Sequence, residues 1–164
     1  MAERQSTFIE LGKKVSAISA AISKCYLESD TPEPSLEPTS TEVLETPEYS
    51  KLRASLNEAA NELMLLVNGP KRTLRAFGCL HFDLAAFQTA LEFDFFEAVP
   101  LDGTITLADL VKKLELSEDQ VGRTLRLLAT NRIFVESQPG VFSHTSLSAL
   151  IARDSDIKAA GQMQ

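Results

Sequence analysis

The histidines and cysteines are the side chains whose types could support nucleophilic or general base chemistry in this sequence. Cys79 and His81 lie two residues apart, and a thiol beside an imidazole is one form of activated nucleophile. Such catalysis also needs a third group to orient the base, and this pair has none beside it. His144 precedes Thr145 where a strand is expected to give way to a helix, so we expect a structural hydrogen bond there. We predict no catalytic residue and, without any CxxC spacing, no metal ligand.

The glycines are too widely spaced to form a cofactor-binding loop. No two of the seven glycines lie within eight residues of each other. Loops that cradle phosphates or dinucleotides need clustered glycines between a strand and a helix. The sequence therefore predicts no cofactor-binding residue in these 164 residues.

Two arginines, Arg123 and Arg126, fall on a helix that would enter the major groove in a DNA-binding winged helix. From Thr104 to His144, however, five acidic residues balance five basic ones. Glu118 and Asp119 would also repel phosphates at the amino-terminal end of this helix. Because DNA affinity depends on a positive surface, the sequence favours a scaffold role and predicts no nucleic-acid partner.

The acidic residues concentrate in one proline-rich segment, residues 28–48. This segment holds seven acidic residues, four prolines and no Lys or Arg, which leaves 16 acidic and 16 basic residues elsewhere. It is predicted to be a flexible linker because it has too little apolar surface to offset its ordering entropy. Apolar runs reach only five residues, from Leu63 to Val67, so no membrane association is expected. Two cysteines without a secretory leader favour a cytoplasmic location.

Residues 1–27 are predicted to contain an amphipathic helix whose apolar stripe is narrow enough to pack on another helix. A second helix from Tyr49 carries a similar stripe and ends at Gly69-Pro70. Because the linker would let the first helix dock on either its own domain or a partner's, we predict that the two helices contribute to a dimer interface. The predicted interface residues are Phe8, Leu11, Val15, Ile18, Ile22, Leu56 and Leu63.

Residues 49–154 as a whole are predicted to form a winged-helix-like domain, so the fold class is mainly α with a small β-hairpin wing and tethered N-terminal dimerisation helices. The expected elements after Pro70 are a short helix to Cys79 that buries Leu74 and Phe77, a helix from Asp83 to Val99, helices capped by Thr106 and Ser117, strands at 133–136 and 141–143 around Pro139-Gly140, and a last helix through Ile151.

The second half of the chain also carries a series of short motifs in a fixed order. They are Phe95–Val99 (FFEAV), Gly103 with Thr106, Val121–Leu128 (VGRTLRLL), Ile133–Glu136 (IFVE), Gly140, and His144–Ser148 (HTSLS). This series resembles the N-terminal dimerisation domain of plant- and fungal-type S-adenosylmethionine-dependent O-methyltransferases. The first two helices and the acidic linker are similar in arrangement to the longer fungal versions of that domain.

The resemblance implies a homodimer, with helix exchange between subunits as one form of it, and a role in secondary metabolism. In that family the cofactor and the catalytic histidine belong to a separate C-terminal domain, so residues 155–164 would begin the connection to it and the fragment alone would not methylate. The parent would use S-adenosyl-L-methionine to methylate a small aromatic or polyketide-like metabolite. Phe93 lies off the apolar stripe of its helix and is our candidate for a substrate-pocket wall.

Two alternatives stay open at this point. The same fold could serve a transcriptional regulator or coactivator, since fold does not determine function. Relatives with this architecture can also be pericyclases or non-catalytic partner modules.

Overall fold

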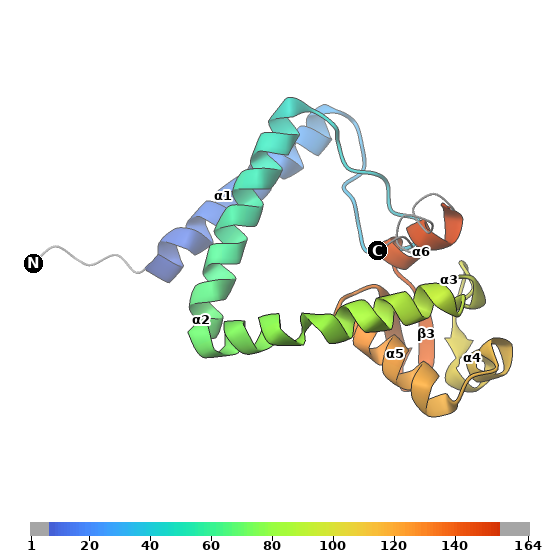
Figure 1. Cartoon of the computed structure of the whole chain (residues 1–164). Helices are drawn as coiled ribbons and strands as arrows, with labels where there is room; N and C mark the ends of the chain where they lie inside the picture. The colour runs from blue at the N-terminus through green and yellow to red at the C-terminus, as the bar shows by residue number, and fades with distance from the viewer. Residues whose placement is uncertain (1–6, 155–164) are drawn as a thin grey trace, which may run out of the picture. The chain divides into compact units, whose positions relative to one another are not determined.

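The computed structural model describes residues 7–154 and is mainly helical, which confirms the predicted fold class (Figure 1). By contacts the chain divides into two units, one of Met1–Pro34 with Thr41–Gly78 and one of Ser35–Ser40 with Cys79–Gln164; we call them unit 1 and unit 2. The elements within the described residues are α1 (Thr7–Glu28), α2 (Pro47–Glu92), α3 (Phe95–Ala98), β1 (Ile105–Thr106), α4 (Leu107–Leu114), α5 (Glu118–Thr130), β2 (Phe134–Gln138), β3 (Val141–His144) and α6 (Ser146–Arg153).

Unit 2 contains a three-stranded antiparallel sheet in the order β1-β3-β2. The predicted hairpin wing is confirmed, with Phe134 opposite His144 and a register shift near its turn. β1 was not predicted, because two residues are too few to show an alternating pattern. It forms where β3 offers a free edge, and Ile105 lies opposite Phe142 there.

The short helices of unit 2 begin at the predicted caps. Thr106 Oγ1 accepts a hydrogen bond from the Asp109 backbone N–H at 3.2 Å. Ser117 forms a capping box with Gln120, in which each residue satisfies a backbone N–H of the other. These local bonds fix where α4 and α5 start, and so which faces they turn to the core.

The core of unit 2 is built on aromatic rings from α3 and from both wing strands. Phe96 and Phe134 stack with their ring centroids 5.3 Å apart. The wing is therefore packed onto the helices rather than projecting from them. The fully buried core residues of unit 2 include Ala90, Phe95, Phe96, Leu110, Val121, Leu125, Leu128, Phe134 and Phe142.

The helix boundaries around the start of this core differ from the prediction. α2 continues through Cys79 to Asp83 without a break, and Asp83 is not a helix cap but accepts a hydrogen bond from Asn131 Nδ2 at 3.0 Å. The single helix predicted to reach Val99 is instead interrupted at Asp94, which has the left-handed φ of 55°. Tertiary packing overrides local preference there, because the turn carries Phe95 and its neighbour into the core.

Unit 1 pairs α1 with the first part of α2. The rings of Tyr26 and Tyr49 meet edge to face with their centroids 5.7 Å apart. The Tyr26 hydroxyl accepts a hydrogen bond from the backbone N–H of Leu44, and its hydrogen bond with Tyr49, together with burial, raises the pKa of Tyr49. The two tyrosines therefore hold the carboxyl-terminal end of α1 in contact with the start of α2.

The predicted break at Gly69 is confirmed, although helical structure resumes at once. Gly69 has φ 67° and ψ 170°, a conformation that only glycine adopts readily. Pro70 follows at a position where its missing N–H costs nothing, and Thr73 Oγ1 donates to the Gly69 carbonyl at 2.9 Å. The redirection of α2 thus depends on one glycine.

We expect Gly69→Ala to lower the free energy of unfolding by about 1–3 kcal/mol, because a Cβ is strained at this φ and ψ. Gly78→Ala is the matched control: neither glycine has an atom within 4 Å of an added Cβ, but Gly78 is helical. The control should stabilise the chain by about 0.5–1 kcal/mol. Urea titrations of both variants test this, and equal effects of the two substitutions would contradict it.

Candidate functional site

Unit 1 exposes apolar side chains on either side of Gly69. Met64, Leu65, Leu66 and Val67 are 45–67% exposed. Four consecutive helical residues point to all sides of a helix, since each is turned by about 100° from the last. Such a segment is expected to be covered from more than one direction when the protein is assembled.

The prediction that Leu74 and Phe77 are buried was wrong. They are 71% and 73% exposed in the segment of α2 that follows Gly69. The sequence shows that a helix has an apolar stripe but does not show what packs on it, and no described part of unit 1 packs on this one. We call Met64–Val67 together with Leu74 and Phe77 the elbow surface.

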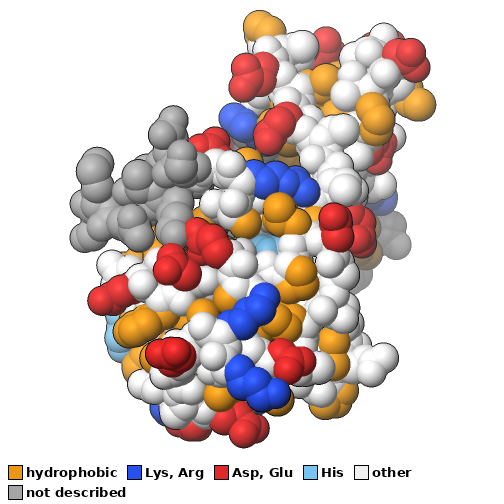
Figure 2. Space-filling model, turned by 90° about the vertical axis from the view of Figure 1, so that its right-hand side faces the viewer, with side chains coloured by type: hydrophobic (Ala, Val, Ile, Leu, Met, Phe, Trp, Pro, Cys, Tyr) orange, Lys and Arg blue, Asp and Glu red, His pale blue; other side chains and the backbone are white. Residues whose placement is uncertain are grey.

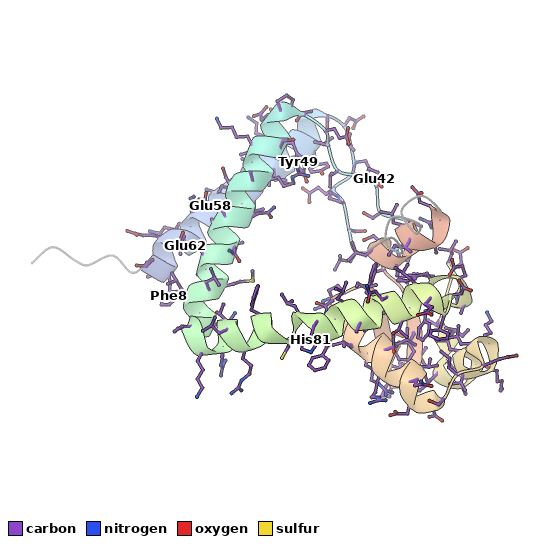
Figure 3. The ribbon with its side chains drawn as sticks, viewed as in Figure 1. Phe8, Glu42, Tyr49, Glu58, Glu62 and His81 are labelled. Carbon is purple, nitrogen blue, oxygen red and sulfur yellow. The ribbon has the colours of Figure 1, made fainter. Side chains whose placement is uncertain are left out.

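The predicted interface residues of α1 are covered to different degrees. Phe8, labelled at the start of α1 in Figure 3, is 51% exposed. Leu11 is buried within the chain, and Val15, Ile18 and Ile22 are half-buried. On α2, Leu56 and Leu63 are also half-buried. Their role in an interface between subunits stays a prediction.

Unit 2 carries an apolar groove of about 410 Å³ between α2 and α5. Ala85, Ala86 and Thr89 supply small side chains from α2, and Leu127 lies on the α5 side. Phe93, predicted as a pocket wall, lines this groove and is 42% exposed. We call this feature the α2–α5 groove.

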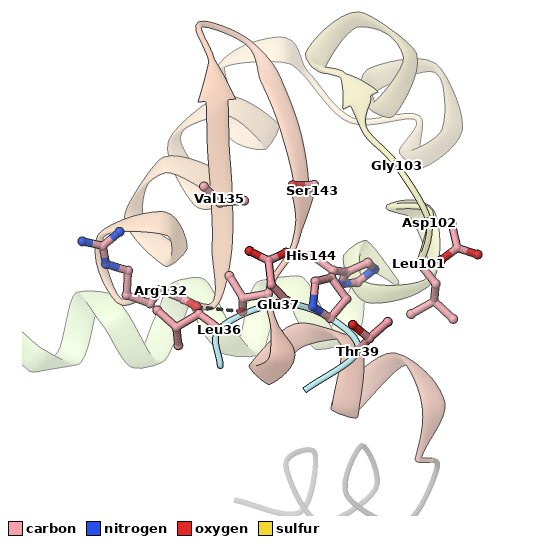
Figure 4. Close-up of a pocket in the computed structure, with 12 residues that line it drawn as sticks. Leu36, Glu37, Thr39, Leu101, Asp102, Gly103, Arg132, Val135, Ser143 and His144 are labelled. Atoms are coloured by element: carbon pink, nitrogen blue, oxygen red, sulfur yellow. Dashed lines mark hydrogen bonds between the residues drawn. The ribbon is translucent and has the colours of Figure 1, made fainter. Parts of the chain in front are cut away.

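A second hollow of about 450 Å³ lies within unit 2, where residues 35–40, from the middle of the acidic segment, contact the rest of that unit (Figure 4). The Leu36 carbonyl accepts a hydrogen bond from the Ser146 N–H at 2.9 Å, and the Pro38 carbonyl accepts one from Arg153 Nη1 at 2.8 Å. The sequence offered no signal for this contact because its acceptors are backbone carbonyls. The flexibility of 28–48 as a whole stays a prediction.

His144 borders this hollow. Its side chain makes structural hydrogen bonds, as predicted. The Val99 carbonyl, 3.0 Å from Nε2, can only accept, so Nε2 carries the proton. Nδ1 then accepts from the Ser148 hydroxyl at 2.9 Å. With both nitrogens engaged and the side chain buried, His144 ties β3 to α6 and to the residue after α3, and it is not placed to act as a general base.

Cys79 and His81 are exposed on α2, and the His81 ring lies tilted by 41° against the Phe82 ring, with the centroids 3.9 Å apart. Over residues 7–154 no group of three His, Cys, Asp or Glu side chains could hold a metal ion. Within the same residues no helix is long and apolar enough to cross a membrane.

The arginines of the candidate recognition helix are already paired with acidic residues. Arg123 lies 2.7 Å from Asp119, and Arg126 lies 3.2 Å from Glu136, which also accepts from the Gly140 N–H of the wing turn. Figure 2 shows acidic, basic and apolar side chains interspersed over the face in view. These pairings favour the scaffold interpretation over base reading.

The fold and these surfaces define a class: a helical domain of winged-helix type with uncovered apolar surface. The particular family follows from comparison with known proteins. Residues 79–154 match the family model of the O-methyltransferase dimerisation domain. Residues 79–154 therefore belong to the family of O-methyltransferase dimerisation domains, which confirms the resemblance found in the motifs.

Fungal proteins are similar over nearly the whole chain. O-methyltransferase sol2 of Alternaria solani is 40% identical over 95% of this chain, and O-methyltransferase phnC of Penicillium herquei is 31% identical over 94%. Chlorophenol O-methyltransferase of Trichoderma longibrachiatum is 34% identical over 68%. The chain spans 36%, 37% and 24% of these relatives, or about a third of their length.

A solved structure shares the fold. OxaC in complex with SAH and oxaline superposes with a TM-score of 0.71 at 17% sequence identity, covering 96% of this chain and 36% of that one. OxaC in complex with sinefungin and meleagrin gives a TM-score of 0.68. At this identity the likeness concerns the fold alone.

The stability of the chain should depend on the protonation of His144. Burial lowers the pKa of His144 below its ordinary value of 6.5, and hydrogen bonds to the backbone of Val99 and Phe96 only partly offset this. Since the unfolded chain binds this proton at higher pH than the folded one, the free energy of unfolding falls as pH drops below 6.5. His144→Asn should cost about 1–3 kcal/mol at pH 8, and its gap to the wild type should narrow at pH 5.

Urea titrations at both pH values measure that gap. Other titrating groups are common to the two proteins and cancel in the comparison. A gap that stays constant from pH 8 to pH 5 would show that His144 is not held neutral by the fold.

Proposed function

We propose that this chain is the dimerisation module of an S-adenosylmethionine-dependent O-methyltransferase of fungal secondary metabolism, and that it forms a homodimer. The observation that carries the proposal is the elbow surface, in which Met64–Val67 are exposed on all sides of one helical turn. Burial of each large apolar side chain stabilises an assembly by about 1.5–3 kcal/mol before entropic costs. Because one flat contact covers one side of a helix, the proposal favours an interlocked dimer in which segments of both copies enclose the elbow.

The proposal extends to the parent enzyme through its relatives. Those named above are O-methyltransferases, and OxaC was solved with SAH and with sinefungin. The parent would transfer the cofactor's methyl group to a hydroxyl oxygen, which loses its proton. Chlorophenol O-methyltransferase supports a small aromatic hydroxyl compound as the acceptor. Phe93 would line the acceptor pocket or the interface beside it, and the proposal places the enzyme in the cytoplasm, with both cysteines reduced.

Replacement of one elbow side chain by an acid should dissociate the homodimer. Phe77→Asp removes a large apolar contact in both copies and places a charge in each, so the dimer Kd should rise at least about 100-fold. Leu27→Asp is the matched control, since Leu27 is 79% exposed at the end of α1, outside the elbow surface and the predicted stripe. Sedimentation equilibrium of the three proteins gives the Kd values.

The wild type and Leu27→Asp are expected at twice the chain mass, and Phe77→Asp at the mass of one chain with an unchanged circular dichroism spectrum. If the wild-type chain stayed monomeric even at 100 times the protein concentration used in the sedimentation experiment, the homodimer would be refuted. Equal Kd values for the two variants would refute the role of the elbow surface.

A further inference from the structure

We propose that residues 35–40, which we call the strap, act as a reversible latch on unit 2. In the docked state the strap forms one side of the hollow that His144 borders. In the released state the whole segment between α1 and α2 becomes one free tether. The inference goes beyond the proposed function and does not depend on the homodimer.

The strap is a turn that its own side chains hold together. Ser40 Oγ accepts a hydrogen bond from the Ser35 backbone N–H at 2.8 Å. Ser35 Oγ accepts one from the Glu37 N–H at 3.2 Å, and the Glu37 carbonyl accepts one from the Ser40 N–H at 2.9 Å. Local hydroxyl bonds of this kind stabilise a turn without help from distant residues. The strap can therefore dock and detach as one piece.

The two ends of α6 hold the strap on unit 2. The Leu36 carbonyl accepts a hydrogen bond from the N–H of Ser146, the first residue of α6, and the Pro38 carbonyl accepts one from Arg153, the last residue. The Ser146 N–H is one of the four that a helix leaves without an internal partner. The guanidinium is the stronger donor of the two, because hydrogen bonds from charged groups contribute more than those between neutral groups. Arg153 therefore controls how much of the time the latch is closed.

The strap contributes little to the core of unit 2. Leu36 is 55% exposed, and Ser35, Glu37 and Thr39 are exposed as well. The buried core cluster of unit 2 contains none of the six strap residues, all of which the structure describes. Detachment breaks two hydrogen bonds to unit 2 and exposes hardly any apolar surface. Segments of this kind open locally at a much lower free energy than the whole domain.

Release of the strap opens the hollow. Figure 4 shows Leu36, Glu37 and Thr39 of the strap along one side of it, and Val135 and Ser143 of the wing strands line another side. When the strap detaches, these wing side chains gain access to solvent. Access to this hollow therefore depends on the latch.

The latch also sets the length of the tether between α1 and α2. The docked strap divides residues 29–46 into two stretches, 29–34 and 41–46, each of which spans at most about 20 Å. As one released tether, residues 29–46 span up to about 60 Å. Release of the strap therefore lets α1 move farther from the start of α2.

Arg153→Gln tests the latch, because glutamine fits a helix but is shorter than arginine and carries no charge. We expect the Ser146 N–H to exchange with solvent at least about 10-fold faster in this variant than in the wild type, since the strap that covers it is released. The N–H of Ala149, which bonds to the Thr145 carbonyl within α6, should keep its wild-type rate. Hydrogen exchange measured residue by residue by NMR gives both rates.

Arg123→Gln is the matched control. It removes another exposed arginine of unit 2, whose partner Asp119 lies on the same helix, so it should leave the exchange of both amides unchanged. A second measurement follows backbone motion through the heteronuclear NOE. The strap amides should be as rigid as those of β3 in the wild type and as mobile as a free tether in Arg153→Gln.

Three results would overturn the inference. If the wild-type Ser146 amide exchanged no faster than the core amide of Leu125, the strap would be part of the core and not a latch. If the strap amides were mobile in the wild type, the strap would not be docked. If Arg153→Gln acted no more strongly than Arg123→Gln, or accelerated Ala149 as much as Ser146, the effect would not pass through the strap.

Discussion

The structure depends on a hydrophobic surface that the single chain does not cover. Between residues 64 and 84, many large apolar side chains of α2 are exposed to water. They are Met64, Leu65, Leu66, Val67, Leu74, Phe77, Leu80, Phe82 and Leu84. Water penalises such surface in proportion to its area, and monomeric proteins rarely keep so much of it on one element. The exposed apolar surface of α2 is therefore the surface that the proposed dimer would cover.

Unit 2 contains the last turns of this helix. Its carboxyl-terminal part packs into a core of aromatic rings, and His144 links β3, α6 and the backbone of Val99 through two buried hydrogen bonds. Paired buried polar groups hold one arrangement, because any other would leave a donor or acceptor unsatisfied. A well-defined platform limits the ordering entropy that association must overcome.

The winged helix illustrates how one fold serves different purposes. In a DNA-binding protein the arginines of the second helix must be free to reach base edges. Here Arg123 and Arg126 are paired with Asp119 and Glu136, and the wing strand packs Phe134 into the core. The Arg126–Glu136 pair links α5 to the wing strand β2, and we propose that the apolar face of α2 is the interaction surface.

The sequence by itself determined much of the local structure. In unit 2 it predicted the caps at Thr106 and Ser117 and the wing around Pro139-Gly140, and in unit 1 it predicted the break at Gly69. These features depend on neighbours in the chain, so residue type and spacing were sufficient to predict them. The same motifs identified the O-methyltransferase family. Phe93 was selected because it falls off an apolar stripe, a signal that periodicity makes visible.

Only the tertiary structure decided which apolar stripes are covered. Leu74 and Phe77 look like core residues in the sequence. An apolar stripe has the same residue spacing whether it packs against its own chain or against another chain. The left-handed turn at Asp94, the strand β1 and the contact of residues 35–40 with α6 were also invisible, since each depends on a partner distant in the chain. Burial is a property of the whole fold, and it alone separated the core of this domain from the exposed apolar surface that we propose as an interface.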